Sequence, residues 1–275
     1  MEKLTKNKNI ASLIFGIILA LIFLFPIYLL VVNSLKTPRD VFLNTLGFPE
    51  EYMFANFVRA WDMMDFGKVF FNSIFLCVGS ISLLIISSVM AAWVLVRTKT
   101  ILSSIIFIMF IAAMVIPFQS VMLPLVGFMS AIGLLNTRFG LMFMYLGFGS
   151  SLSIFLYHGF IKSIPASLEE AAIIDGCSKP LVLWLIVFPL LKPITFTVVI
   201  LNLIWIWNDY LLPSLVISAK DLRTIPLSMF FFFGQYTKQW HLAMAALTLA
   251  IVPVIVFFIM AQKQIIRGIT QGAIK

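Results

Sequence analysis

The sequence predicts an all-α polytopic membrane protein with six transmembrane helices. Of its 275 residues, 62% are hydrophobic and only 11% are charged, and the mean hydropathy is +1.09. The apolar residues lie in long continuous runs, whereas a membrane β-barrel would show short alternating segments. In a bilayer each segment has to satisfy its own backbone hydrogen bonds, which favours helices. A soluble domain is excluded.

The first predicted span covers residues 10–32, which carry no charge. At about 1.5 Å per residue, a helix of this length crosses the roughly 30 Å hydrocarbon core. Residues 33–68 form a polar loop on the outer face. Within it, a helix on the membrane surface is expected from five apolar residues at helical spacing: Phe57, Val58, Trp61, Met64 and Phe66.

The five remaining spans are predicted at about residues 69–96, 101–126, 139–160, 194–209 and 242–261. Pro117 and Pro124 are expected to break the third span. Carbonyl groups freed by a proline must face protein or a water-filled cavity. Gln119, which lies between the two prolines, is therefore interpreted either as lining a cavity or as part of a packing kink.

We expect three parts along the chain: an N-terminal transmembrane helix with its outer loop (1–68), a core of five transmembrane helices with a charged central loop (69–262), and a basic tail (263–275). Six spans place both termini and the central loop on one face. That face carries more of the 19 Lys and Arg residues and carries them in short loops, so we assign it to the cytoplasm.

The central loop, residues 163–192, has three acidic residues within seven positions, in a chain with only 11: Glu169, Glu170 and Asp175. Ser167, followed three residues later by Glu170, predicts a capping box at the start of a short helix. Gly176 is expected to end this helix in a left-handed conformation, which glycine adopts without steric cost.

A second segment is expected to begin at Pro180, which suits the first turn of a helix. Its apolar run to Leu191 is too short to span a bilayer, and Phe188 and Pro189 are expected to close it. A flexible linker would carry Gly, Ser and polar residues instead. We interpret the loop as a rigid helix–turn–helix knob, with a solvated charged loop as the simpler alternative.

Charged residues are nearly absent from the spans, which argues against a proton- or sodium-coupled carrier. The one candidate is Asp209, near the outer end of the fifth span. It has two interpretations of similar weight. Either Asp209 reaches the membrane interface, or Asn208 and Asp209 line a polar translocation path.

The sequence carries no sign of catalytic chemistry. It has no Gly-x-x-x-x-Gly-Lys-Ser/Thr phosphate loop and no His-Glu-x-x-His or paired-cysteine zinc motif. His158 and His241 stand alone near span ends, and Cys77 and Cys177 are expected at different depths, without a disulfide. From the missing motifs we expect no enzyme activity and no metal. We also expect no nucleic-acid binding, since the basic residues form no patch.

The central loop closely resembles the EAA loop of bacterial ABC importer permeases. The resemblance rests on Glu170-Ala171-Ala172, Asp175-Gly176 and Phe188-Pro189, where the family usually has Leu-Pro. Six segments, in the same order along most of the chain, resemble the carbohydrate-type permeases: 115–125, 133–137, 160–172, 207–209, 222–226 and 268–275. The last segment resembles the end of maltose-permease G-type subunits.

The resemblance implies the type I ABC importer permease fold with a cytoplasmic coupling helix in an EAA loop at 163–192. It also implies a bacterial plasma (inner) membrane location and a set of partners: a second permease subunit in a heterodimer, two ABC ATPase subunits and an extracytoplasmic solute-binding protein. ATP and Mg would be bound by the ATPase, with no cofactor in this chain. The implied cargo is a sugar, with an oligosaccharide favoured.

Two groups of contact residues follow from the same resemblance. The ATPase-coupling group comprises Glu169, Glu170, Ala171, Ala172, Asp175 and Gly176. The tail is implied to reach between the ATPases through Thr270, Gln271, Gly272 and Lys275.

Three alternatives stay open on the sequence. The same machinery could carry a polyol or a glycerol-phosphate-type solute. More distant are a stand-alone ion-coupled carrier and a membrane scaffold that transports nothing.

Overall fold

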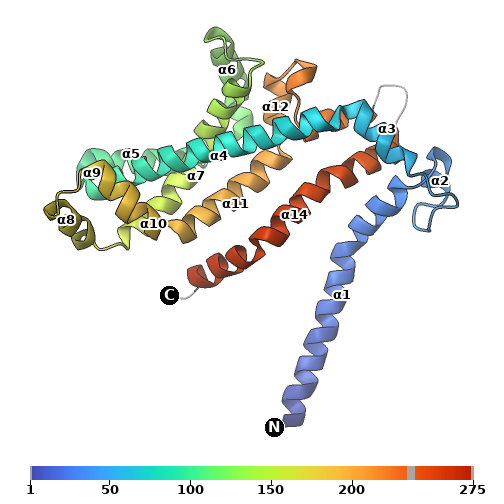
Figure 1. Cartoon of the computed structure of the whole chain (residues 1–275), viewed down its shortest axis with the longest axis horizontal. Coiled ribbons are helices and arrows are strands. Elements are labelled where there is room, and N and C mark those ends of the chain that lie inside the picture. Colours follow the sequence, from blue (N-terminus) through green and yellow to red (C-terminus); the bar gives the residue numbers. More distant parts are fainter. Residues whose placement is uncertain (1, 234–238, 274–275) are drawn as a thin grey trace. The chain divides into compact units, whose positions relative to one another are not determined.

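The computed structural model describes residues 2–233 and 239–273, with side chains for 12–230, 232–233, 239–260 and 262. The chain divides into two compact units. The first comprises residues 1–67 and 228–257, and the second comprises 68–227 and 258–275. Figure 1 shows the helices of both units.

In the first unit, helix α1 (Glu2–Ser34) leads into a compact loop with two short helices, α2 (Pro38–Leu43) and α3 (Ala55–Met64). The fully buried Lys36 holds this loop together, because its Nζ donates to Asn33 Oδ1 at 3.2 Å and to the carbonyl of Asn44. Asn56 Nδ2 donates to the carbonyls of Ser34 and Lys36, both at 2.9 Å.

Helix α3 lies where the apolar pattern predicts a surface helix. Val58 and Trp61 are exposed, whereas Met64 is buried. Phe66 is also buried but belongs to the next helix, α4, because Asp65 adopts a left-handed conformation between the two helices. The long helix α14 (Trp240–Ala273) begins in this unit, after α13 (Ile225–Met229) and a 3₁₀ turn, η3 (Phe230–Phe232).

The second unit is built around three long helices: α4 (Phe66–Arg97), α7 (Arg138–Lys162) and α11 (Lys192–Asn208). Two pairs of consecutive segments in this unit are sharply bent. Helices α5 (Ile101–Ala113) and α6 (Phe118–Ala131) are bent by 105°. The segment Lys179–Leu190 is bent by 78° from α11.

Within the described residues, four helices are long and apolar enough to span a membrane, and counting each bent pair as one span gives six, the number predicted. The bend between α5 and α6 comes just before Phe118, at Pro117, as predicted. Pro124 does not break the chain and lies inside α6. The lost backbone hydrogen bond is thus accommodated within the helix.

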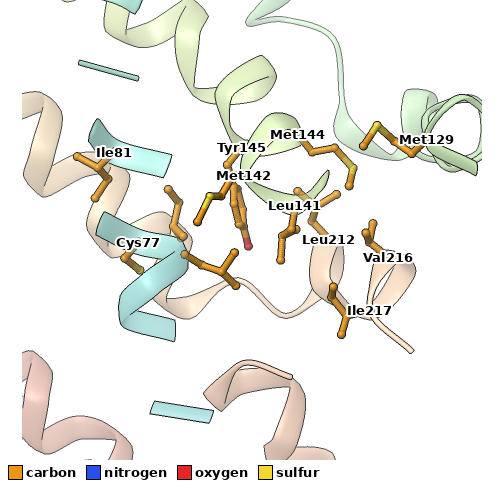
Figure 2. Close-up of a cluster of buried hydrophobic side chains, with 12 residues drawn as sticks. Cys77, Ile81, Met129, Leu141, Met142, Met144, Tyr145, Leu212, Val216 and Ile217 are labelled. Carbon is orange, nitrogen blue, oxygen red and sulfur yellow. The ribbon is translucent and has the colours of Figure 1, made fainter. Parts of the chain in front are cut away.

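Two buried clusters hold the second unit together. One joins α4, α6, α7 and α12 (Leu211–Val216) around Tyr145, as Figure 2 shows. The other joins α4 and α7 to the central loop and to α11, and it includes Val89, Tyr157 and Val198. Tyr157 also donates a hydrogen bond to Thr195 Oγ1 at 3.1 Å, which fixes α7 to α11.

Polar contacts fix the chain between α12 and α13 to the start of α4 and the start of α7. Asn72 Nδ2 donates to the carbonyls of Asp221 and Arg223, and its Oδ1 accepts from Arg138 Nη2 at 2.9 Å. Asn136 Oδ1 accepts from two further backbone amides of this segment, which also contains the 3₁₀ turn η2 (Lys220–Leu222). The segment is therefore ordered without a core of its own.

The start of α7 leaves no room for a side chain at Gly140. A Cβ atom there would lie 2.0 Å from the carbonyl oxygen of Leu134. We expect Gly140→Ala to destabilise the protein by about 1–3 kcal/mol, because the backbone has to shift. The measurement is the apparent melting temperature of the full chain in detergent.

Gly147→Ala in the same helix is the control, since a Cβ atom there meets nothing within 4 Å. Equal melting temperatures for the two variants would contradict the close packing at Gly140.

Candidate functional site

Helix α8 (Ala166–Ile174) forms the first half of the central loop, and Figure 1 shows it at the end of α4 together with α9 (Lys179–Leu181) and α10 (Phe188–Leu190). The predicted capping box is wrong. The helix starts after Pro165 and has no side-chain cap, so Ser167 already lies within its first turn. Proline supplies the start because its fixed φ favours the extended conformation that precedes a helix.

The other end of α8 is capped as predicted. Gly176 has a φ of +90°, the left-handed conformation that favours glycine. Its N–H donates to the carbonyl of Ile173 at 3.0 Å, and the N–H of Cys177 donates to the carbonyl of Ala172 at 2.9 Å. This pair of bonds is the Schellman motif, which satisfies the last carbonyls of a helix and turns the chain sharply.

The inward face of α8 carries a buried carboxylate. Glu169 is 6% exposed, and its Oε1 accepts from Arg97 Nη2 at 2.6 Å and Nε at 2.9 Å. Its Oε2 accepts from Trp93 Nε1 at 2.9 Å. Arg97 Nη2 also donates to the carbonyl of Ile164 at 3.1 Å. The end of α4 thus holds both the start of α8 and the chain that leads into it.

Ala172, three residues after Glu169 and therefore on the same helix face, is also buried. It packs in the second cluster with Tyr157, Ile161 and Val182. A small side chain is required here because α8 lies directly on this core. Of the predicted coupling group, Glu169 and Ala172 therefore point inward.

The outward face of α8 presents an apolar stripe at helical spacing: Leu168, Ala171 and Ile174. Leu168 is 47% exposed and Ile174 is 85% exposed. Glu170, Asp175 and Gly176 are exposed beside this stripe. An exposed Ile174 next to carboxylates is a surface that another protein could cover.

The segment after α8 continues further than the sequence predicts. A π-helical turn (Val182–Val187) connects α9 to α10, and the chain breaks at Leu191 rather than at Pro189. Pro189 has no N–H for the carbonyl four residues earlier, and the π turn precedes it. Val182, Leu183 and Val187 pack into the second cluster, so the knob is rigidly attached.

The sequence reasoning missed four residues of this site. Trp93 lies inside the second predicted span and Arg97 directly follows it, but neither is predicted as a site residue, and Leu168 and Ile174 are not predicted either. The sequence does contain a signal for Leu168 and Ile174, because their spacing puts both on one helix face with Ala171. No local signal links Arg97 to Glu169, which is 72 residues away.

The three residues of the predicted translocation path lie on different elements. Gln119 is exposed in the first turn of α6, and Asn208 is at the end of α11, where its Nδ2 donates to the carbonyl of Ile204. Asp209 follows and is half-buried. Its Oδ2 accepts from Tyr145 Oη at 3.0 Å, and its Oδ1 accepts from the N–H of Leu211 at 3.0 Å. These bonds fix the start of α12.

The predicted tail contacts fall at the edge of what the structure describes. Thr270, Gln271 and Gly272 lie in the last turns of α14, where only the backbone is described. Lys275 lies outside the described residues.

Within residues 2–233 and 239–273, no group of three His, Cys, Asp or Glu residues could hold a metal ion. Cys77 is buried, Cys177 is partly exposed, and both are free thiols. His158 stacks on Phe107 with ring centroids 3.7 Å apart, which is a packing contact between α7 and α5.

Comparison with known proteins gives consistent matches over the whole chain. The family described as "Binding-protein-dependent transport system inner membrane component" matches residues 83–271. The chain is 48% identical over 275 residues, 100% of both chains, to the "Probable starch degradation products transport system permease protein" of Thermoanaerobacterium thermosulfurigenes. It is 37% identical to the melibiose/raffinose/stachyose import permease protein of Bacillus subtilis, over 98% of each chain.

Among solved structures, one chain of a bacterial ABC transporter involved in the import of the acidic polysaccharide alginate has the same fold. The TM-score is 0.80, with 94% of this chain and 96% of that chain covered at 23% identity.

The buried ion pair at the base of α8 gives a testable prediction. In Glu169→Gln, the guanidinium of Arg97 loses its partner charge, which for a largely buried pair costs about 3 kcal/mol. We expect the backbone amides of α8 to exchange with solvent about a hundredfold faster, measured by hydrogen exchange and mass spectrometry on the full chain.

Glu170→Gln is the matched control, because it removes the same charge from the exposed neighbouring position. If Glu170→Gln accelerated exchange as much as Glu169→Gln, the ion pair would not be what holds α8.

Proposed function

The chain belongs to the family of binding-protein-dependent transport system inner membrane components, and from that premise we propose that it is a permease subunit of an ATP-driven sugar importer. The names of its relatives support a sugar cargo, since they import starch degradation products and melibiose, raffinose or stachyose. Identity over the full length of both relatives favours the same role. Oligosaccharides are the cargo class that these names share.

We further propose that the permease functions as half of a translocation pore, with a second permease subunit forming the other half. Two ABC ATPase subunits bind at the cytoplasmic face, and an extracytoplasmic solute-binding protein delivers the sugar. ATP and Mg are bound by the ATPase, so this chain itself is not an enzyme. Both termini and α8 lie on the cytoplasmic side of the bacterial plasma membrane, as the distribution of Lys and Arg favours.

The observation that carries the coupling proposal is the two-sided construction of α8. Its inward face is fixed to α4 by the Glu169–Arg97 pair and to α7 by the second cluster. Its outward face exposes Leu168, Ala171 and Ile174. An ATPase that binds the outward stripe therefore moves α8 as a rigid body, and the inward contacts transmit that movement to the spans.

This construction divides the predicted coupling group into two roles. Glu170, Ala171 and Asp175, with Leu168 and Ile174, form the proposed contact surface. Glu169, Ala172 and Gly176 determine the position and the end of α8. Thr270, Gln271, Gly272 and Lys275 in the tail stay a proposed additional contact.

Along the proposed transport path, Gln119 and Asn208 are exposed side chains that a solute could reach. Both carboxylate oxygens of Asp209 already accept hydrogen bonds, one from Tyr145 and one from the N–H of Leu211 at the start of α12. We therefore propose that Asp209 holds the elements along the path in place and does not bind the sugar.

The proposed function is tested by purifying the chain with its native partners in mild detergent and measuring ATP hydrolysis with candidate sugars. We expect a second permease and an ATPase to co-purify, with hydrolysis stimulated by the sugar-loaded binding protein. In Gly176→Pro we expect that stimulation to be lost while the complex still inserts, since proline cannot adopt a φ of +90°.

Gly176→Asn is the control, because asparagine tolerates the left-handed conformation, and we expect it to retain stimulation. Unchanged uptake in Gly176→Pro would overturn the coupling role of the turn. Transport by the chain alone in proteoliposomes, without ATP, would overturn the proposed function. Stimulation by polyols or glycerol phosphate and not by sugars would overturn the sugar assignment.

The outward stripe gives a separate prediction. Leu168→Ser combined with Ile174→Ser is expected to reduce the amount of ATPase that co-purifies, because burial of each aliphatic side chain contributes about 1.5–3 kcal/mol to an interface. The fold itself should be unaffected, since both side chains are exposed.

The control is Leu185→Ser combined with Leu190→Ser, which makes the same change at exposed positions outside α8. Full ATPase recovery with the α8 variant, measured against the control, would exclude the stripe as the contact.

A further inference from the structure

A large open groove lies beside α8, between the end of α4, the start of α5 and the end of α7. Its volume is about 1460 Å³. It begins at the coupling helix, with Glu169 and Glu170, and extends along α5 to Phe107 and Ile108. The groove thus runs from the polar central loop to the apolar helix α5.

The polar part of the groove is rich in positive charge. Of its four Lys and Arg residues, Arg97 is neutralised by Glu169. Lys99, Lys162 and Lys179 also line the groove, and in the described part of the chain their ammonium groups form no hydrogen bond or ion pair. Glu170 is the one other carboxylate in the lining. The groove therefore has a surplus of unpaired ammonium groups and attracts an anion.

Hydroxyl donors accompany these lysines. Thr98 and Ser103 line the same groove, around the start of α5. Ammonium and hydroxyl groups together are typical ligands of phosphate oxygens. A phosphate group would therefore find both charge and hydrogen-bond donors here.

The apolar part of the groove indicates what the phosphate is attached to. Phe107 and Ile108 belong to α5, a charge-free helix, and Phe107 stacks on His158 of α7. Ile101, at the start of α5, is 81% exposed. A soluble anion would leave this apolar surface uncovered, whereas the acyl chains of a lipid would pack against it.

We propose that this groove binds the phosphate head group of an anionic membrane lipid, with Lys99, Lys162 and Lys179 as its ligands. Basic pockets between transmembrane helices at the cytoplasmic surface are suited to such head groups. The alternative occupant, a segment of a partner protein, fits less well because the groove continues along the apolar flank of α5. The proposal goes beyond the proposed function and rests on it only for the cytoplasmic location of the central loop.

The consequence for the protein is a lipid next to the contact that positions α8. A head group held by Lys162 of α7 and Lys179 of α9 joins the two sides of the central loop. Its presence stabilises the arrangement in which Arg97 holds Glu169. An anionic lipid would thus favour the coupled geometry.

The test compares lipid binding by the purified full chain and by Lys99→Gln/Lys162→Gln/Lys179→Gln. Phosphatidylglycerol and phosphatidylcholine are titrated separately in detergent and counted by native mass spectrometry. We expect the full chain to prefer phosphatidylglycerol, and each lysine removed to weaken its binding about fivefold. Phosphatidylcholine binding should not change.

The control is the single variant Lys192→Gln, compared with Lys99→Gln, Lys162→Gln and Lys179→Gln one at a time; Lys192 is an exposed lysine of the same unit that does not line the groove. We expect Lys192→Gln to bind phosphatidylglycerol as the full chain does. Equal loss in Lys192→Gln and in the single variants of the groove lysines, or no preference for phosphatidylglycerol, would overturn the proposal.

A titration with inorganic phosphate separates the two possible sources of the anion. Retention of phosphatidylglycerol in millimolar phosphate supports a lipid site, and displacement by phosphate overturns it in favour of a soluble anion. If a partner ATPase displaces the lipid stoichiometrically, the groove is a protein contact and the proposal is wrong.

Discussion

The position of α8 in the second unit depends on one buried carboxylate. Glu169 has to be desolvated for α8 to lie on the core, and this is costly unless each oxygen finds a donor. Arg97 and Trp93 supply those donors from a single helix, four residues apart and therefore on the same face. Arg97 and Trp93 together determine where α8 lies along α4 and how α8 is rotated about its own axis. They therefore determine which residues of α8 face outward.

The ion pair at Glu169 also helps to explain why α8 is rigid although it is short. An isolated helix of nine residues would be marginal in water. Here the Schellman turn at Gly176, the packing of Ala172 and the ion pair at Glu169 act on successive turns. Helix α8 is therefore held as a rigid body against α4 and α7.

A similar use of a carboxylate occurs at the opposite end of α11. Asp209 accepts from Tyr145 inside the first cluster and from the backbone at the start of α12. The sequence leaves open whether it reaches the interface or lines a path, and the structure adds a third role, a structural one. The buried Glu169 and the half-buried Asp209 thus each fix a short helix against a long one.

The sequence by itself determines the features that are local. Charge-free runs of sufficient length predict the spans, Pro117 predicts a sharp bend, and Gly176 predicts the turn after α8, because each depends on a few neighbouring residues. Only the tertiary structure decides which of the adjacent residues Glu169 and Glu170 is buried. It likewise decides which of Ala171 and Ala172 packs on the core, and where the π turn lies. Those outcomes depend on Arg97 and on the second cluster, which the chain brings to α8 from distant segments.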